Sequence, residues 1–319
     1  MRGTAILADI GGTNARFALL RNGRLTARRR MRVADFASFD AALAEYLAEW
    51  RGALRPPRMA VAAAGPISGD VIRMTNSPWH ISAGALRAAF RLRDVVLVND
   101  FAAVAWAVPR LAARQTVAIG GGRSQSDAPI AILGPGTGLG VAGVIPGIGG
   151  PRVLVTEGGH VTMAAADSRE GAVLDHLRAR FGHVSAERVL SGDGLVILAQ
   201  AIAALDGQVA EGYTAAEITE RALAGSCPTC AAALATFCAM LGTVAGNLAL
   251  TLGARGGVYI AGGIVPRFVD YLAASAFRAR FEGKGRFAAY LAAIPTRVIV
   301  HQDLAFLGLR ALLQEPSRR

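Results

Sequence analysis

The sequence has little charge, few aromatic residues and only three cysteines. Charged residues make up 18% of the chain and hydrophobic residues 53%, which excludes an intrinsically disordered protein, because that class combines low hydrophobicity with high net charge. An odd, low cysteine count in 319 residues indicates a reducing compartment, and no signal-peptide pattern opens the sequence, so we expect a cytoplasmic location. A chain of this length buries a sizeable core and favours two domains over one.

Lysine is nearly absent, since Lys284 is the only one, and arginine supplies the rest of a formal net charge of +11. Such a charge can indicate a nucleic-acid partner. The sequence shows no helix-turn-helix, no RNA-binding motif and no basic stretch interleaved with aromatic residues. We therefore expect no nucleic-acid partner and interpret the charge as a compositional enrichment in arginine.

An uncharged run over residues 128–151 has the length of a membrane span. It holds eight glycines and four prolines, however, which favour strand, turn, strand and loop. We expect no membrane partner.

Strand-like and helix-like segments alternate along the chain, which predicts the α/β class. The predicted strands are 5–8, 16–20, 59–64, 95–98, 129–133, 257–260 and 298–300, with 95–98 buried on both faces. The predicted helices are 35–50, 101–107, 168–181, 194–204, 214–225, 231–252 and 306–313. The domain boundary is expected near Pro109, which gives a small domain over 1–108 plus 301–319 and a large domain over 109–300.

Two glycine turns each follow a predicted buried strand, Asp9-Ile-Gly-Gly-Thr13 and Gly134-Pro-Gly-Thr-Gly138. At an offset of 124 positions their Gly-Thr pairs coincide, which is a faint internal repeat. Glycines with positive φ and a threonine hydroxyl can grip phosphate oxygens, and Asp9 could hold Mg²⁺ directly or through water. Each turn alone is equally compatible with a plain hairpin.

Three further segments carry polar or glycine motifs. Asn99-Asp100 follows a predicted strand, where Asp100 suits either a general base or a helix N-cap. Gly262-Gly263 follows another strand and suits either a surface for an adenine ring or a strand-to-helix turn. Glu157-Gly-Gly-His160 suits a hydroxyl-binding loop, a catalytic dyad or a metal pair.

Two motifs are less informative. Glu187 would ordinarily be a solvated helix residue. Cys227-Pro-Thr-Cys230 is a single CxxC, for which a structural thiol pair is favoured over a redox or zinc site.

Taken together, the order and spacing of these motifs closely resemble the bacterial glucokinase family over residues 5–308. The segments that carry the resemblance are Asp9-Ile-Gly-Gly-Thr-Asn-Ala-Arg16, Asn99-Asp-Phe101, Gly134-Pro-Gly-Thr-Gly-Leu-Gly140, Glu157-Gly-Gly-His160, Ser185-Ala-Glu-Arg-Val-Leu-Ser-Gly192, Ala261-Gly-Gly-Ile-Val-Pro-Arg267 and Phe277–Phe287. The resemblance implies the two-domain, actin-like ATPase (ribonuclease H-like) fold of hexokinases, with ATP, Mg²⁺ and glucose in an interdomain cleft, and a homodimer.

The resemblance also implies a role for each motif in ATP-dependent phosphorylation of D-glucose at its 6-hydroxyl. Asp100 would be the general base, and the sugar hydroxyls would contact Asn99, Asp100, Glu157, His160 and Glu187. Nucleotide and Mg²⁺ would contact Ala8, Asp9, Ile10, Gly11, Gly12, Thr13, Gly136, Thr137, Gly138, Gly262 and Gly263. Relatives with a zinc-binding cysteine cluster after the Gly-Gly-His loop form a neighbouring group, and the absence of cysteine between Gly159 and Ser226 predicts no structural zinc.

Two alternatives stay open. The chain could phosphorylate another hexose, such as fructose, mannose or an amino sugar. It could also be a sugar-responsive regulator, which in this fold would need an added DNA-binding module.

Overall fold

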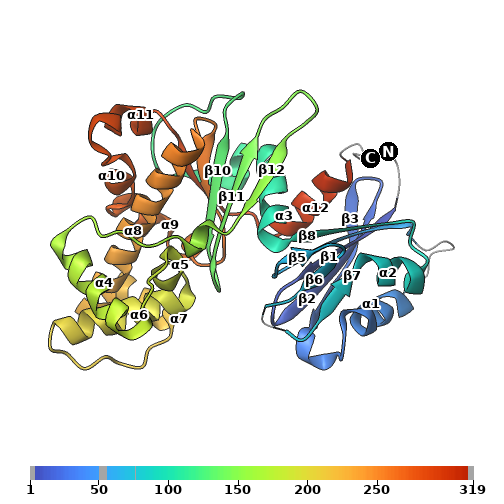
Figure 1. Cartoon of the computed structure of the whole chain (residues 1–319), viewed down its shortest axis with the longest axis horizontal. Helices are drawn as coiled ribbons and strands as arrows, with labels where there is room; N and C mark the ends of the chain where they lie inside the picture. Colours follow the sequence, from blue (N-terminus) through green and yellow to red (C-terminus); the bar gives the residue numbers. More distant parts are fainter. Residues whose placement is uncertain (1–3, 50–55, 76, 315–319) are drawn as a thin grey trace. The chain divides into compact units, whose positions relative to one another are not determined.

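The computed structural model describes residues 4–49, 56–75 and 77–314, and the chain divides into two compact units (Figure 1). Unit 1 comprises residues 1–111 and 302–319, and unit 2 comprises residues 112–301. Each unit is described by itself.

The described part of unit 1 contains a five-stranded sheet in the order β3-β2-β1-β4-β8. β1 (Ala5–Ile10), β2 (Asn14–Arg21) and β3 (Arg24–Arg32) form an antiparallel meander. β4 (Arg58–Ala63) pairs parallel with β1, and β8 (Asp94–Asn99) pairs parallel with β4. A small sheet joins β5 (Ile67–Ser68), β6 (Val71–Arg73) and β7 (His80–Ser82).

The alternation of side chains along β1 builds the two cores of unit 1. Ile6, Ala8 and Ile10 point into a core closed by α1 (Phe39–Ala48) and α2 (Ala83–Phe90). Ala5 and Leu7 point into a second core, which α3 (Asp100–Ala107) and α12 (Leu304–Gln314) close. Both faces of the strand that leads to the first glycine turn are therefore packed.

α3 and α12 pack against each other at very close range. A Cβ atom added at Gly308 of α12 would collide with the carbonyl of Ala103 in α3. Only glycine permits this approach, so the last helix and the helix that begins with Asp100 form one packed pair.

The described part of unit 2 contains a six-stranded sheet in the order β12-β11-β10-β13-β14-β9. β10 (Ile130–Pro135), β11 (Leu139–Ile145) and β12 (Arg152–Thr156) form an antiparallel meander. β13 (Gly257–Ile260) and β14 (Thr296–Ile299) add parallel to β10, and β9 (Thr116–Ala118) pairs antiparallel with β14. The first five strands thus repeat the topology of the unit 1 sheet, which confirms that the chain builds the same glycine hairpin twice.

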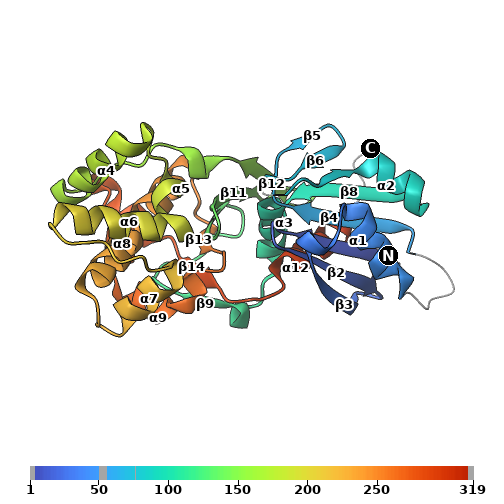
Figure 2. The ribbon, with the colours of Figure 1, turned by 90° about the horizontal axis from the view of Figure 1, so that it is seen from below.

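α8 (Pro228–Leu252) is the central helix of unit 2 and contacts α6 (Gly192–Leu205) and α7 (Ala215–Leu223) (Figure 2). Among the described helices, α8 is the one long and apolar enough to cross a membrane, but 72% of its apolar window is buried in the fold. A core helix passes the same test, and α8 supplies much of the unit 2 core.

The remaining helices of unit 2 are short, apart from α4 (Ser168–Phe181). They are α5 (Ala186–Val189), α9 (Val269–Ala274), α10 (Phe277–Glu282) and α11 (Ala288–Ala292). The family-like segment 277–287 is structural here, because the Arg278 guanidinium donates to the carbonyls of Ala292 at 3.0 Å and Ile294 at 2.9 Å. This side chain holds the turn that leads into β14.

Two departures from the predicted elements have a clear physical reason. Residues 95–98 are predicted to be buried on both faces, and both faces do pack against a core, but β8 is an edge strand and Val96, Leu97 and Val98 are only partly buried. The helix expected from residue 35 begins at Phe39, because the Ser38 hydroxyl caps it by accepting the Ala41 N–H at 3.1 Å. The last predicted residue of that helix, Trp50, lies outside the described residues.

Candidate active site

The first glycine turn connects β1 to β2 in unit 1. The Gly11 N–H donates to the Asn14 carbonyl at 2.9 Å, and Gly12 and Thr13 are exposed. Neither glycine has the positive φ that the sequence led us to expect. A Cβ at Gly11 would meet only the Asn14 carbonyl, at 3.8 Å. The fold therefore gives no reason for glycine at position 11, and the open space suits close approach of a ligand to the backbone.

Asp9 lies just before this turn and is 9% exposed. Its carboxylate pairs with the Arg16 guanidinium from β2. Burial raises the pKa of Asp9 above its ordinary value, the charge and hydrogen bond of Arg16 oppose that shift, and the charge of Asp303 adds to it. The neighbouring Ala8 and Ile10 side chains are fully buried in the core, so any ligand contact from them would come from the backbone.

Arg16 is the residue that sequence reasoning missed in this turn, although it belongs to the quoted motif. The hairpin register pairs Asp9 directly with Arg16, and opposite charges in directly opposed positions of adjacent strands stabilise each other. Counting the register back from the turn would have identified the pair.

Asn99 and Asp100 lie where β8 ends and α3 begins. Asn99, rather than Asp100, is the N-cap: its Oδ1 accepts the N–H of Phe101 at 2.9 Å and of Ala102 at 3.3 Å. The Asn99 amide also donates to the Gly65 carbonyl at 3.4 Å. The Asp100 Oδ1 accepts the Phe101 N–H at 2.8 Å, and the side chain is half-buried. The alternative that Asp100 is itself the cap is therefore wrong.

The strand register places these two motifs on one edge of the unit 1 sheet. Ile10 of β1 pairs with Ala63 of β4, which pairs with Asn99 of β8, and all three strands run parallel. Two strand spacings separate the first glycine turn from Asn99, a distance of about 10 Å. The carboxyl edge of a parallel sheet is where ligands bind in this class of fold.

The second glycine turn connects β10 to β11 in unit 2. The Gly136 N–H donates to the Gly138 carbonyl at 2.8 Å, and the Gly136 carbonyl accepts the Gly192 N–H at the start of α6 at 2.9 Å. A Cβ at Gly136 would meet only the Gly138 carbonyl, at 4.0 Å, and Thr137 is exposed. The turn thus presents an open backbone beside the N-terminus of a 14-residue helix, an environment that attracts anions.

Glu157, His160 and Glu187 meet in space, although Glu187 comes from a different segment. His160 Nε2 lies 4.0 Å from Glu157 Oε2, and His160 Nδ1 lies 3.8 Å from Glu187 Oε1. The Glu187 Oε2 accepts the Leu139 N–H at 2.8 Å, so this residue is not an ordinary solvated helix residue. The result is a surface group of two carboxylates and one imidazole, connected to the second glycine turn through the Leu139 N–H.

Gly262 and Gly263 follow β13, and the fold requires glycine at the first position but not at the second. Gly262 has φ +90°, and a Cβ there would clash with the Pro135 carbonyl at the end of β10. Gly263 has no neighbour within 4 Å of an added Cβ. Gly262 is therefore a structural glycine that packs β13 against the second turn, and Gly263 leaves the open space beside it.

Each unit gathers its own predicted residues. Unit 1 brings the first glycine turn to the sheet edge that carries Asn99 and Asp100. Unit 2 joins the second turn to Gly262-Gly263 through Pro135 and to the cluster of Glu157, His160 and Glu187 through Leu139.

Comparison with known proteins identifies the family of this chain. The family model described as Glucokinase matches residues 6–316. The chain belongs to the glucokinase family. A protein of Paramagnetospirillum magneticum named "Glucokinase" is 52% identical over 314 residues, which cover 98% of each chain.

Solved structures agree with the predicted fold. The crystal structure of a glucokinase from an Antarctic psychrotroph is 37% identical, covers 99% of this chain and 100% of its own, and has a TM-score of 0.90. A ROK family glucokinase from Streptomyces griseus, solved in complex with glucose and AMPPNP, is 20% identical with a TM-score of 0.63, covering 97% and 99%. The two-domain, actin-like ATPase fold predicted from the sequence is confirmed.

Proposed function

We propose that the chain transfers the γ-phosphoryl group of ATP to the 6-hydroxyl of glucose, giving glucose 6-phosphate and ADP. The observation that carries this proposal is the contact of Glu187 with both His160 and the second glycine turn, at 3.8 Å and 2.8 Å. It connects a hydroxyl-binding cluster to a candidate phosphate loop within one unit. Membership of the glucokinase family supports the same substrates.

In this proposal the polar side chains bind the sugar and Asp100 acts as general base. Glu157, His160, Glu187 and Asn99 would hold sugar hydroxyls. The Asp100 carboxylate would accept the proton of the 6-hydroxyl as its oxygen attacks the γ-phosphorus and the bond to the ADP oxygen breaks. The hydrogen bond from the Phe101 N–H to Asp100 Oδ1 fixes the carboxylate in one orientation for this step.

The nucleotide would lie on the glycine turns. The open backbone at Gly11, Gly136 and Gly263 admits phosphate oxygens or a flat ring without displacing protein atoms. The start of α6 beside Gly136 favours the negative charge of the phosphates. A bound Mg²⁺ would neutralise charge that develops on the phosphates, and Asp9, a carboxylate of the hard-oxygen type that Mg²⁺ prefers, would hold it directly or through water.

A coupled assay of the full chain with ATP and glucose, with and without Mg²⁺, tests the proposal. Asp100→Ala is expected to lower kcat at least ~10²-fold, the low end for a positioned general base. Asp40→Ala is the matched control, because it removes a carboxylate from the first turn of α1 and leaves the site untouched. Near-normal turnover by a folded Asp100→Ala variant would reject Asp100 as the base.

Sugar selectivity needs its own measurement. Initial rates with fructose, mannose and glucosamine beside glucose rank the acceptors, and a higher kcat/KM for another sugar would replace glucose in the proposal. Homodimer formation stays a prediction, which light scattering at assay concentrations tests.

A further inference from the structure

Cys227 and Cys230 lie at the start of the central helix of unit 2, away from the residues assigned above. Cys227 is the N-cap of α8, and its Sγ accepts the Cys230 N–H at 3.2 Å. α8 runs for 25 residues from Pro228 at its first position. A thiolate at the N-cap of a long helix is stabilised by the otherwise unpaired N–H groups and by the helix dipole.

The two thiols differ in exposure. Cys227 is half-buried, whereas Cys230 is 2% exposed, and both are free in this structure. This is the division that a nucleophilic thiol and a resolving thiol require, since the first must meet a solution reagent and the second only needs to reach the first. Cys238, two turns further along α8, is fully buried in the core.

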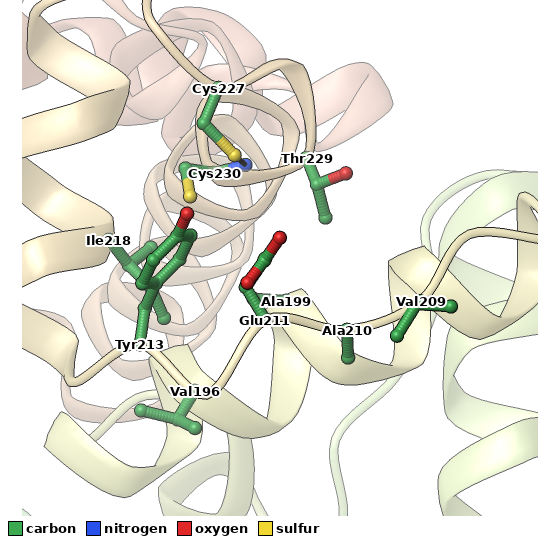
Figure 3. A pocket seen from close by; sticks show the side chains of 10 residues that line it. All are labelled: Val196, Ala199, Val209, Ala210, Glu211, Tyr213, Ile218, Cys227, Thr229 and Cys230. Carbon is green, nitrogen blue, oxygen red and sulfur yellow. Dashed lines mark hydrogen bonds between the residues drawn. The ribbon is translucent and has the colours of Figure 1, made fainter.

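Both cysteines line a small pocket of about 50 Å³, in which the Cys230 sulfur and the Tyr213 hydroxyl point toward each other and the Cys227 sulfur lies beside the Cys230 backbone nitrogen (Figure 3). Glu211, which is exposed, Thr229, which is half-buried, and Ile218, which is buried, also line this pocket. Cys227 is half-buried, so part of this residue stays in contact with solvent in the folded chain.

The charges around the pair favour a thiolate on Cys227. Burial by itself raises the pKa of Cys227, but hydrogen bonds from Cys230 and Thr229 and the charge of Arg221 outweigh it, so that the pKa is lowered. Arg221 is held there over the Tyr213 ring, 4.2 Å from its centroid. The Glu211 carboxylate also lines the pocket. Burial and the neighbouring thiol raise the pKa of Cys230 to about 12.

We propose that Cys227 and Cys230 form a redox-active dithiol that reacts with small disulfides, with Cys227 as the attacking thiol and Cys230 as the resolving thiol. The Cys227 thiolate attacks one sulfur of the disulfide, a mixed disulfide forms at Cys227, and one thiolate leaves. Cys230 then attacks the Cys227 sulfur and gives up its proton to the second leaving thiolate. The protein dithiol is oxidised to the 227–230 disulfide, and the small disulfide is reduced to two thiols. The proposal does not depend on the proposed kinase function.

The test treats the full chain with glutathione disulfide, traps free thiols by alkylation, and locates the products by fragmentation mass spectrometry. We expect the loss of two hydrogens between Cys227 and Cys230, reversed by excess reduced glutathione, with Cys238 unmodified. In untreated protein, Cys227 is expected to alkylate at least ~10-fold faster than Cys230 or Cys238 near neutral pH, because the thiolate is the reactive form.

Two variants separate the roles of the thiols. Cys230→Ser should accumulate glutathione as a mixed disulfide on Cys227, since the resolving thiol is gone, whereas Cys227→Ser should form neither product. Circular dichroism establishes that each variant is folded. A folded Cys230→Ser variant without the mixed disulfide, or wild-type protein without the 227–230 disulfide, overturns the proposal. Zinc that is released from the purified protein when these thiols are alkylated also overturns it, because the pair would then be metal ligands.

Discussion

Glu187 Oε2 accepts a hydrogen bond from the backbone N–H of Leu139 at 2.8 Å, between residues 48 positions apart in the sequence. The same oxygen occupies the space that a Cβ atom at Gly138 would need. The Glu187 carboxylate therefore fixes the position of the second glycine turn relative to the cluster of Glu157, His160 and Glu187. Glycine at position 138 is explained by the carboxylate beside it as much as by any ligand.

Substitution of Glu187 by Gln is expected to lower kcat/KM for glucose while leaving the fold intact. The amide oxygen of Gln can still accept the Leu139 N–H, so the thermal midpoint should change little. A hydrogen bond to a charged group contributes about 1.5–3 kcal/mol, which corresponds to a loss of about ten- to a hundredfold in kcat/KM. Steady-state kinetics with glucose varied at saturating ATP measures the effect.

A Gly138→Ala variant tests the same role of Glu187 by a second route. Its new methyl group would displace the Glu187 carboxylate, so it should reproduce the effect on glucose. Equal kinetics for wild type and both variants would remove Glu187 from the sugar site.

Gly262→Ala and Gly263→Ala are expected to separate stability from nucleotide binding. Alanine at position 262 would be strained at φ +90° and would clash with the Pro135 carbonyl, so we expect a loss of at least about 2 kcal/mol in the free energy of unfolding. Alanine at position 263 meets nothing within 4 Å, so stability should stay within about 0.5 kcal/mol and the KM for ATP should rise. Urea denaturation and ATP titrations give the two readouts, and a stable Gly262→Ala variant would contradict this assignment.

Elements whose apolar pattern is strong were predictable from the sequence. The 168–181 helix and the 257–260 strand have their predicted bounds, and the 101–107 helix begins one residue earlier than predicted. In each case the signal is local: apolar periodicity with a capping residue, or a short apolar run that a turn ends.

Elements that depend on tertiary context were missed. β3 carries Arg24, Arg28, Arg29 and Arg30 and shows no apolar alternation, because it is an edge strand with most side chains exposed. The partners of these arginines come from distant parts of the chain. The Arg28 guanidinium, for example, donates to the Asp303 carboxylate at 2.5 Å, and the two residues are 275 positions apart in the sequence. Single-sequence reasoning has no access to such pairs, and the same holds for Glu187 and Leu139.

Arg16→Ala is expected to destabilise the protein in a pH-dependent way. It leaves the buried Asp9 carboxylate without its cation. Because the Arg16 side chain is 38% exposed, solvent screens the pair, and we expect a cost of about 1–2 kcal/mol at neutral pH. The pKa of Asp9 is already raised by burial, and removal of Arg16 raises it further. A carboxyl with a raised pKa stabilises the folded state in its protonated form, so the deficit of the variant should grow as the pH rises above about 4, the ordinary pKa of a carboxyl.

Urea denaturation of wild type and variant across that range measures the difference. The double variant Asp9→Asn/Arg16→Ala is the control, because it has no carboxylate to titrate at this position and its deficit should not change with pH. A deficit of Arg16→Ala that is constant with pH would mean that Asp9 is not the group left uncompensated.

Gly308→Ala and Gly171→Ala are expected to change stability in opposite directions, although both replace a glycine inside a helix. Alanine ordinarily stabilises a helix interior by about 0.5–1 kcal/mol relative to glycine, and Gly171 in α4 has no neighbour within 4 Å of an added Cβ, so that variant should gain this amount. At Gly308 the methyl group would collide with the Ala103 carbonyl and force α12 away from α3, at a cost of at least about 2 kcal/mol. Because α3 begins with Asp100, the same displacement should lower kcat in Gly308→Ala and leave it unchanged in Gly171→Ala. Urea denaturation and the coupled assay on the two variants measure both effects, and a Gly308→Ala variant that is more stable than wild type would show that the two helices do not require their close contact.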